Sequence, residues 1–229
     1  MEEPLFLTGY DPTAYARPSI TVDCVLLGVA GGRLCVLLTR RTRPPFAGRW
    51  ALPGGFVGID ESLEAAATRV LGMKAGLTDI AVEQVHAFGN TDRDPRMRII
   101  AIAHRALLAP ARLATVPRHA DQCLATIDAD GSIMVDGGVV TLAFDHADII
   151  AMTIANLRRT IDDDAFALVP EHFTLRELQG VHEAVLGRPL NKPAFRRRML
   201  ERGALRATGA FEAGRAFRPA ELYVYVPKG

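Results

Sequence analysis

The stretch LPGGFVGIDESLEAAATRVLGMKAGL, residues 52–77, places a glycine turn directly before a run of good helix formers. The pair Gly54-Gly55 lets the backbone approach a ligand closely, because glycine has no Cβ atom to obstruct it. We predict a helix over residues 61–73, with Asp60 capping its start and Gly76 ending it. The glycine turn is therefore a candidate cradle for a ligand.

The composition is that of an ordinary globular protein, because 49% of the residues are hydrophobic and 23% are charged, which excludes a disordered chain. No apolar run approaches the 18 residues of a membrane span, and the acidic start MEEPLFLTGYDP does not resemble a secretory signal. Cys24, Cys35 and Cys123 are far apart and show no CxxC spacing, so we expect buried thiols rather than disulfides or a zinc site. We expect a soluble, cytoplasmic protein without a membrane partner.

Two domains are predicted from the length of 229 residues and from the order of patterns along the chain. Strands are expected at 20–29, 33–40, 81–89 and 98–107, a loop or loose hairpin at 126–138, and a helix at 146–161. The run Asp162-Asp163-Asp164 is then either a hinge between domains or a polar turn that ends the helix. We predict domains at residues 1–161 and 162–229.

The spacing of the opening stretch resembles the Nudix signature, G-x5-E-x7-R-E-U-x-E-E-x-G-U, in which U is an aliphatic residue. The matching positions are Gly55, Glu61, Arg69, Leu71, Gly76 and Leu77. The resemblance implies an α/β (α+β) fold for the first domain: a Nudix-like mixed sheet with flanking helices.

The three signature acids that follow the arginine are replaced by Val70, Met73 and Lys74. Acids at these helical positions project from one face and jointly hold magnesium ions, which polarise a diphosphate and activate water. The Lys74 ammonium opposes a dication about 4 Å away by roughly 8 kcal/mol at an effective dielectric constant of about 20. We therefore expect no catalytic residue, no metal site and no enzymatic activity. An outward-pointing Lys74, with one weak ion on Glu61 or Glu64, is the alternative.

The residues around the glycine turn suit a nucleotide ligand. An aromatic ring can stack on a purine or ribose, and guanidinium groups bind phosphate through paired hydrogen bonds. The candidate ligand-binding residues are Phe46, Arg49, Trp50, Gly54, Gly55, Glu61 and Arg93. Glu61 is also the expected ion-pair partner of Arg69. The alternative for Trp50 is a core position, and for the arginines a solvated surface.

The C-terminal part of the chain is basic, with 11 Lys and Arg against 6 Asp and Glu over residues 165–229. Residues 173–209 hold two amphipathic helical patterns joined by a short turn, which is helix-turn-helix spacing. In the second pattern Asn191 caps the start, and Phe195, Met199 and Leu200 are expected on the buried side. The opposite side carries a crowd of basic residues. A solubilising surface would look the same, but the helix order favours DNA binding.

A wing is predicted after the second helix, with strands at 205–208 and 221–226 around a basic hairpin tip. Such a tip can contact phosphate or the minor groove. The candidate DNA-binding residues are Thr174, Asn191, Lys192, Arg196, Arg197, Arg198, Arg215 and Arg218. The second domain is therefore predicted to be a small winged helix-turn-helix.

The whole chain resembles the Nudix-related transcriptional regulators of NAD metabolism found in bacteria. Besides the box, the matching segments are RPSITVDCVLLG, PPFAGRWALPGGFV, LAFDHADII and FTLRELQGVHEAVLGRPLNKPAFRRRML. The resemblance implies a homodimeric, nucleoid-associated repressor of NAD biosynthesis or salvage genes that binds a palindromic double-stranded DNA operator. It also implies an effector, ADP-ribose or a related NAD metabolite, and no cofactor.

Two alternatives come from other classes of protein. The first is an active Nudix hydrolase of ADP-ribose or a related nucleoside diphosphate derivative. The second is a tail that binds RNA or a protein. An RNA binder would offer exposed aromatic side chains for stacking, whereas Phe195, Tyr223 and Tyr225 are expected to be buried.

Overall fold

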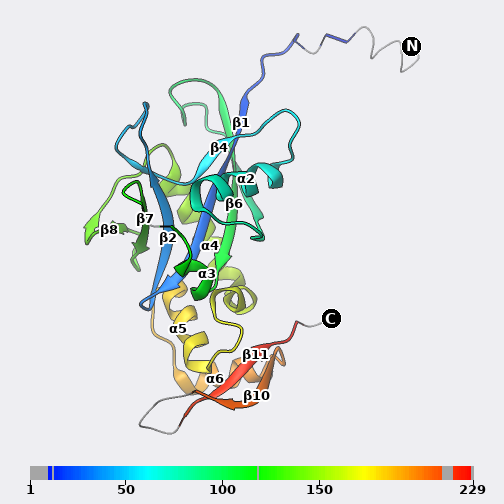
Figure 1. Ribbon diagram of the computed structural model, residues 1–229, viewed down its shortest axis with the longest axis vertical. Coiled ribbons are helices and arrows are strands. Elements are labelled where there is room, and N and C mark those ends of the chain that lie inside the picture. Colours follow the sequence, from blue (N-terminus) through cyan, green and yellow to red (C-terminus); the bar gives the residue numbers. More distant parts are fainter. Residues whose placement is uncertain (1–9, 12, 118, 213–218, 228–229) are drawn as a thin grey trace.

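The computed structural model describes residues 10–227 except 12, 118 and 213–218. A mixed sheet with helices on both faces fills one end of the long axis, and a smaller unit of two helices and a hairpin fills the other (Figure 1). Within the described part, no helix is long and apolar enough to cross a membrane.

The described residues form a nine-stranded sheet with the central order β5-β6-β1-β2-β7-β8-β9. Strands β3 and β4 pair with β2 and β1, and β1 runs parallel to β6. The strands are β1 Ser19–Ala30, β2 Arg33–Arg40, β3 Trp50–Ala51, β4 Gly54–Phe56, β5 Glu83–Phe88, β6 Ile99–Leu108, β7 Gln122–Ile127, β8 Ile133–Val135 and β9 Gly138–Val139. The four predicted strands are confirmed, and of the two alternatives for residues 126–138, a loop or a loose hairpin, the structure shows the hairpin.

The helices and the wing complete the fold. They are α2 Leu63–Ala75, α3 Pro110–Ala114, α4 His146–Asp164, the 3-10 helix η1 Ala165–Leu168, α5 Leu175–Leu186, α6 Lys192–Glu201, and wing strands β10 Leu205–Phe211 and β11 Glu221–Tyr225. Helices α5 and α6 confirm the two predicted amphipathic patterns. The wing strands are confirmed as well, with β10 longer than expected.

Helix α2 begins two residues later than predicted, because Ser62 rather than Asp60 supplies its cap. The Ser62 hydroxyl accepts a hydrogen bond from the Ala65 N–H at 3.1 Å. At the other end Gly76 adopts φ 63°, and its N–H donates to the Gly72 carbonyl at 3.2 Å. The predicted glycine ending is confirmed, since a left-handed residue is tolerated best when it has no Cβ.

Strand β1 separates two apolar layers because its side chains alternate between the faces of the sheet. Val22, Cys24 and Leu26 pack with the buried face of α2. Val25 and Leu27 face the opposite layer, which contains α4. Helices α2 and α4 are thereby held on opposite faces of one strand.

The acidic run that was predicted as a hinge or a polar turn is helical: residues 162–164 form the last turn of α4. The apolar core follows α4 through Leu157 and Ile161 and continues to Phe173, Phe195 and Tyr223 of the C-terminal unit. Of the two alternatives, a hinge or a polar turn that ends the helix, the structure favours the second, because α4 ends at Asp164 and the 3-10 helix η1 follows directly. The domain boundary at 161/162 stays a prediction.

Leu157→Ala tests this shared core. Leu157 is fully buried on α4, so its truncation should lower the free energy of unfolding by about 2–5 kcal/mol. Unfolding in urea, followed by Trp50 fluorescence and by circular dichroism, should give coincident midpoints. Met152→Ala on the same helix, where the side chain is 37% exposed, should cost less than about 1 kcal/mol. The shared core would be refuted if the two variants lost equal free energy of unfolding, or if the sheet and the winged helix unfolded in separate transitions.

Candidate functional site

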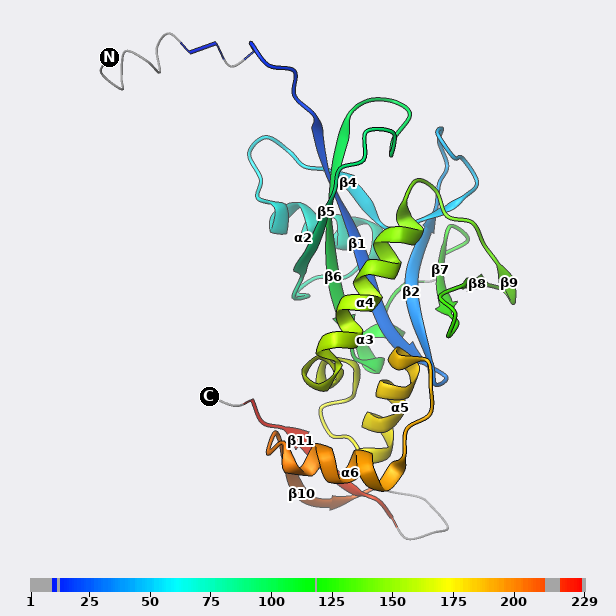
Figure 2. The ribbon, with the colours of Figure 1, turned by 180° about the vertical axis from the view of Figure 1, so that it is seen from behind.

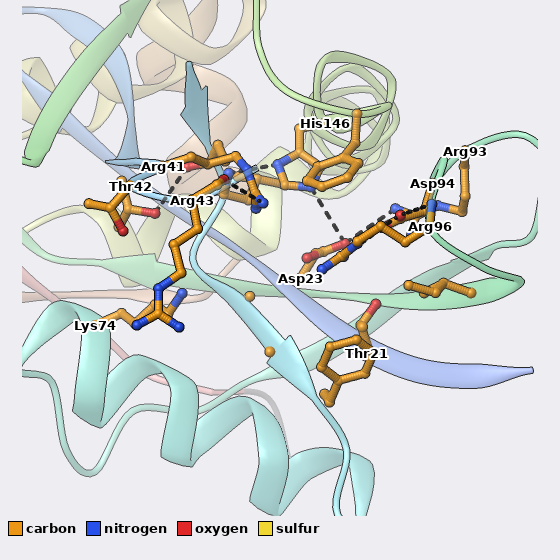
Figure 3. A pocket seen from close by; sticks show the side chains of 18 of the residues that line it. Thr21, Asp23, Arg41, Thr42, Arg43, Lys74, Arg93, Asp94, Arg96 and His146 are labelled. Atoms are coloured by element: carbon orange, nitrogen blue, oxygen red, sulfur yellow. Dashed lines mark hydrogen bonds and ion pairs between the residues drawn. The ribbon is translucent and has the colours of Figure 1, made fainter. Parts of the chain in front are cut away.

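A cavity of about 290 Å³ opens where β1 passes the glycine turn between β3 and β4 (Figure 3). Its walls come from the loop after β2, from α2, from the loop at residues 93–96 and from the residues that lead into α4. These segments are distant in sequence, and the sheet brings their ends together. The cavity is therefore the candidate ligand site of the N-terminal domain.

A buried charge cluster forms one wall of the cavity. The Arg93 side chain is only 4% exposed, and its Nε and Nη2 donate to Asp145 at 2.8 and 2.6 Å. The same Nη2 lies 3.4 Å from Asp23 on β1. A buried guanidinium is costly unless it is paired in this way. Arg93 thus ties its loop to the start of α4.

His146 continues this wall and is held as a neutral ring. Its Nδ1 accepts a hydrogen bond from the Leu52 N–H at 2.8 Å, so that nitrogen carries no proton. The Nε2 lies 3.8 Å from Asp23. Burial lowers the pKa of His146, against the opposing effects of Asp23 and Asp145. The ring therefore points its Nε2–H at the Asp23 carboxylate (Figure 3).

The remaining charged groups of the cavity are mostly basic. The cations of the cavity lining are Arg40, Arg41, Arg43, Lys74, Arg93 and Arg96, against the carboxylates of Asp23 and Asp94. Burial, and then the neighbouring Arg41, lower the pKa of Lys74. Arg41 also lies over the Phe144 ring at 4.7 Å, a cation–π distance. Positive charge beside an aromatic face suits an anionic ligand that carries a ring.

Three of the predicted ligand residues line this cavity: Gly54, Gly55 and Arg93. A Cβ on Gly54 would stand 2.2 Å from an Asp23 oxygen, so only glycine allows β4 to approach β1 here. A Cβ on Gly55 would stand 3.0 Å from a methyl group of Val70. The turn is thus fitted to both the sheet and α2.

The other four predicted ligand residues do not line the cavity. The Phe46 ring packs edge-on against Phe144 at 4.9 Å, and Arg49 lies over Phe46 at 5.3 Å. Half-buried Trp50 pairs through its backbone with Arg40, and the Arg40 guanidinium lies over the Trp50 ring. These side chains support the cavity wall from outside. Ligand contacts by any of the seven residues stay predictions.

Glu61 makes the ion pair expected for it. Its carboxylate accepts from Arg69 Nε at 2.9 Å and from the Gly58 N–H at 2.6 Å. The Arg69 hydrogen bond, followed by the Gly58 one, lowers the pKa of Glu61 to about 2. The carboxylate is thus engaged in shaping the loop that leads into α2.

The three replaced acid positions point in different directions. Val70 is buried in the core beneath the sheet, Met73 is 76% exposed, and Lys74 lines the cavity. Among the described residues, no group of three or more His, Cys, Asp or Glu side chains could hold a metal ion. The residues present on this helix therefore do not fit a magnesium cluster.

The second candidate site is the surface of the helix-turn-helix and its wing. The α6 residues Phe195 and Met199 are buried, whereas Lys192, Arg196 and Arg197 are exposed. A concave space of about 540 Å³ lies between the starts of α5 and α6 and the wing strands. Lys192 and Arg196 line it, together with Arg176 of α5. Glu212 and Glu221 of the wing side also line the groove, so the excess of basic charge lies on α5 and α6, in the element order of a DNA-binding surface.

Two of the predicted DNA-binding residues cap the N-termini of helices. The buried Thr174 hydroxyl accepts from the Glu177 N–H at 3.1 Å and forms a capping box, and the Asn191 side chain caps α6 through Ala194. Arg215 and Arg218 lie outside the described residues. Their DNA contacts stay predictions.

The prediction was wrong for two apolar residues of this unit. Leu200 is exposed, because the buried face of α6 is narrow and is filled by Phe195 and Met199. Tyr225 is also partly exposed, since it lies near the chain end and stacks on Phe166 instead of entering the core. Tyr223 and Phe195 are buried as expected.

Arg198 points from α6 toward α4 rather than into the groove. Its Nη2 lies 3.3 Å from Asp162, and its guanidinium stands over the Phe195 ring at 5.6 Å. Arg202 makes ion pairs with Asp162 and Asp163. The basic residues of α6 therefore divide into a group that faces the groove and a group that faces α4.

Comparison with known proteins agrees with both sites. Residues 17–123 match the NUDIX domain family, and residues 165–225 match the NrtR DNA-binding winged helix domain. The chain is 37% identical over 226 residues to the ADPR responsive transcriptional repressor NtrR of Acinetobacter baylyi, covering 96% of this chain and 87% of that protein. The chain belongs to the NrtR family.

Two crystal structures of the Shewanella oneidensis NrtR are also similar. The complex with a 27mer DNA superposes with a TM-score of 0.71 at 33% identity, over 90% of this chain and 93% of that one. The NUDIX domain complexed with ADP ribose gives a TM-score of 0.54 at 31% identity, over 69% of this chain and 99% of that one. The NrtR fold is thus shared by both parts of this chain.

Sequence reasoning missed several cavity residues of this NrtR family member. Asp23 is a lone acid within an apolar strand run, which is itself a signal of a functional or paired carboxylate. Phe144 and His146 lie in the segment LAFDHADII, just before an amphipathic helix. Nothing local indicates that this segment meets the glycine turn, because it lies about 90 residues further along the chain.

The Glu61–Arg69 pair predicts a titration behaviour in this NrtR family member. Its folded pKa is depressed, so the contact stabilises the loop above the ordinary value of 4.5 and is lost as the pH falls through about 2. An NMR titration of the Glu61 carboxyl should give a pKa of about 2, and Arg69→Ala should return it toward 4.5. Thr68→Ala, on the same helix as Arg69, should leave the pKa of Glu61 low. An ordinary pKa in the wild type would show that the pair does not persist in solution.

Proposed function

We propose that this chain is a transcriptional repressor of NAD biosynthesis or salvage genes whose DNA binding responds to ADP-ribose or a related NAD metabolite. The observation that carries the proposal is the pairing of a basic, aromatic-walled cavity in the NUDIX domain with an exposed basic face on α6. The similar structures complexed with a 27mer DNA and with ADP ribose, and the ADPR responsive repressor, support DNA and ADP-ribose as the two ligands. On this proposal the protein acts in the cytoplasm at the nucleoid.

The cavity suits a diphosphate that joins two sugars. Among the described residues Arg41 and Arg43 form no ion pair, and the Arg41 guanidinium is held by the Pro45 and Arg43 carbonyls, so both can bind phosphate; Phe144 offers a ring face beside Arg41. The His146 ring lies 5.3 Å from the Phe144 ring and 3.8 Å from Asp23, where a ribose hydroxyl could donate to the carboxylate. The effector would be recognised by its charge and by its sugars.

The DNA-binding form is proposed to be a homodimer. In a two-fold dimer, two α6 helices enter successive major grooves of a palindromic operator. Exposed Lys192, Arg196 and Arg197 would contact phosphates, which supplies affinity and makes it salt-dependent. The dimer is proposed to have one arrangement that binds DNA and one that does not. The effector can change the DNA affinity only by as much as its own affinities for these two arrangements differ.

Catalysis is not part of the proposed function. A Nudix hydrolase needs magnesium at the helix that follows the glycine turn, and here that helix presents a buried Val70, an exposed Met73 and a cationic Lys74. A cation in the cavity repels a dication and attracts the ligand's phosphates. The same pocket is thus suited to binding and unsuited to cleavage.

Arg196→Ala combined with Arg197→Ala should abolish operator binding. Both side chains are exposed, so the fold and the ADP-ribose affinity should be unchanged. DNA from NAD-gene promoters is titrated in fluorescence anisotropy at several salt concentrations, with and without ADP-ribose, NAD or nicotinamide mononucleotide. In the wild type, we expect the effector to weaken binding by about 5–150-fold.

Arg17→Ala with Arg112→Ala is the control, because it removes the same charge from exposed sites in the NUDIX domain and should have little effect on DNA binding. Tight, salt-sensitive binding by the Arg196/Arg197 variant would contradict the proposed interface.

The purified chain should not turn over ADP-ribose. With magnesium and substrate, AMP release should stay at the level of the protein-free control, while a known Nudix ADP-ribose pyrophosphatase serves as the positive control. Typical enzymes turn over at about 1 to 10³ per second. Release of AMP at such a rate would establish the hydrolase alternative.

A further inference from the structure

Helix α4 connects the two candidate sites directly. It begins at His146 on the wall of the cavity and ends at Asp164 beside the winged helix, so its 19 residues span about 28 Å. Figure 2 shows it lying along the sheet and ending above α5. Any shift of its first turn must be transmitted to its last, because its length is packed in the shared core.

The last turn of α4 carries three consecutive carboxylates and no basic residue. Negative charge at a helix C-terminus opposes the helix dipole, and neighbouring carboxylates repel one another. Such a turn is stable only when cations from elsewhere approach it. Asp164 obtains its partner from the NUDIX domain, because Arg105 Nη1 of β6 donates to it at 2.6 Å.

The other two carboxylates obtain their partners from the winged helix. Asp162 lies 3.3 Å from Arg198 and 3.5 Å from Arg202, and its Oδ1 is 3.2 Å from Nε2 of the buried His182 on α5. Asp163 pairs with Arg202. One end of α4 is thereby fixed to both helices of the helix-turn-helix.

We propose that Asp162 and Asp163 form a charge clamp on α6, which couples the position of α4 to the orientation of the DNA-reading helix and competes with DNA phosphate for Arg198 and Arg202. The carboxylates occupy the guanidinium groups as a phosphate would, through charge-assisted hydrogen bonds. This inference rests on the proposed function, since it assigns the residues that link effector and DNA.

The clamp gives the two groups of α6 arginines different tasks. Arg196 lines the groove, and Arg197 is exposed beside Glu201 at 3.9 Å; on this proposal both supply DNA affinity whatever the state of the effector cavity. Arg198 and Arg202 are exchanged between carboxylate and phosphate. The effector therefore changes DNA affinity by changing how many arginines can contact the DNA phosphates. Neutralising Asp162 and Asp163 makes their arginine partners available to DNA whether or not the effector is bound.

Asp162→Asn tests the clamp, and Asp163→Asn is a milder second variant because Asp163 is largely exposed and leaves the His182 contact intact. Glu171→Gln is the control, since it removes the same charge from an exposed position of the same domain, which forms no ion pair with α6 in the described part of the chain. DNA binding is measured in anisotropy as a function of salt, with and without ADP-ribose.

Two results are expected. The slope of log K against log salt should steepen by about 1 in Asp162→Asn, because Arg198 is freed while Arg202 keeps its pair with Asp163, and should not change in Glu171→Gln. The ratio of DNA dissociation constants with and without ADP-ribose should fall at least about threefold toward one in Asp162→Asn, less in Asp163→Asn, and stay at the wild-type value in Glu171→Gln.

The two measurements separate failure of the clamp from failure of the proposed function. If both Asp variants keep the wild-type slope and the wild-type ratio, the carboxylates are ordinary surface charges and the clamp is refuted. If wild-type protein binds DNA without any response to ADP-ribose, NAD or nicotinamide mononucleotide, the proposed effector fails, and the salt slope alone decides whether Asp162 competes with phosphate.

Discussion

The burial of one face of α4 is the constraint on which the rest of the structure depends. Ile149, Ile150, Ile154, Leu157 and Ile161 recur at helical spacing and are all buried in one core. Close-packed interiors transmit displacement because they contain few voids that could absorb it. The first turn of α4, which closes the cavity, and its last turn, which contacts α5 and α6, therefore behave as parts of one rigid body.

Charge pairs fix the two ends of this body to different neighbours. At the start, the nearly buried Arg93 reaches Asp145 and Asp23, and at the end Asp162 and Asp163 hold Arg198 and Arg202. Removing one partner from a buried pair leaves an uncompensated charge, which is costly, whereas exchanging it for another partner is not. The buried pairs at the start favour discrete arrangements over gradual ones, whereas the partly exposed pairs at the last turn can exchange their partners at little cost. A ligand phosphate at one end and a DNA phosphate at the other are the natural exchange partners.

The features that the sequence predicted correctly are encoded within a few residues. The β1–β2 hairpin turns at Gly31-Gly32, α2 ends at Gly76, and the buried faces of α5 and α6 show helical spacing. The features that it missed join distant segments: Asp145 lies 52 residues from Arg93, and Arg202 lies 40 from Asp162. Charge alone does not specify a partner, so an acidic run could be a hinge or a helix end when its counter-ions were unknown. The cap of α2 was predicted at Asp60 and lies at Ser62, because both are capping residue types and the sequence alone does not show which side chain reaches the Ala65 N–H.

The replacement of three helix acids changes more than the capacity to bind a metal. A catalytic Nudix helix would turn carboxylates toward the ligand's phosphates and would need magnesium to bind them at all. With Lys74 in the cavity and Val70 filling the space beside Gly55, phosphate can be bound by the protein's own cations. Affinity for the ligand then no longer depends on a metal that also promotes its hydrolysis. On the proposed function, that separation is what a sensor requires, because a ligand destroyed on binding could not hold α4 in one position long enough to affect DNA binding.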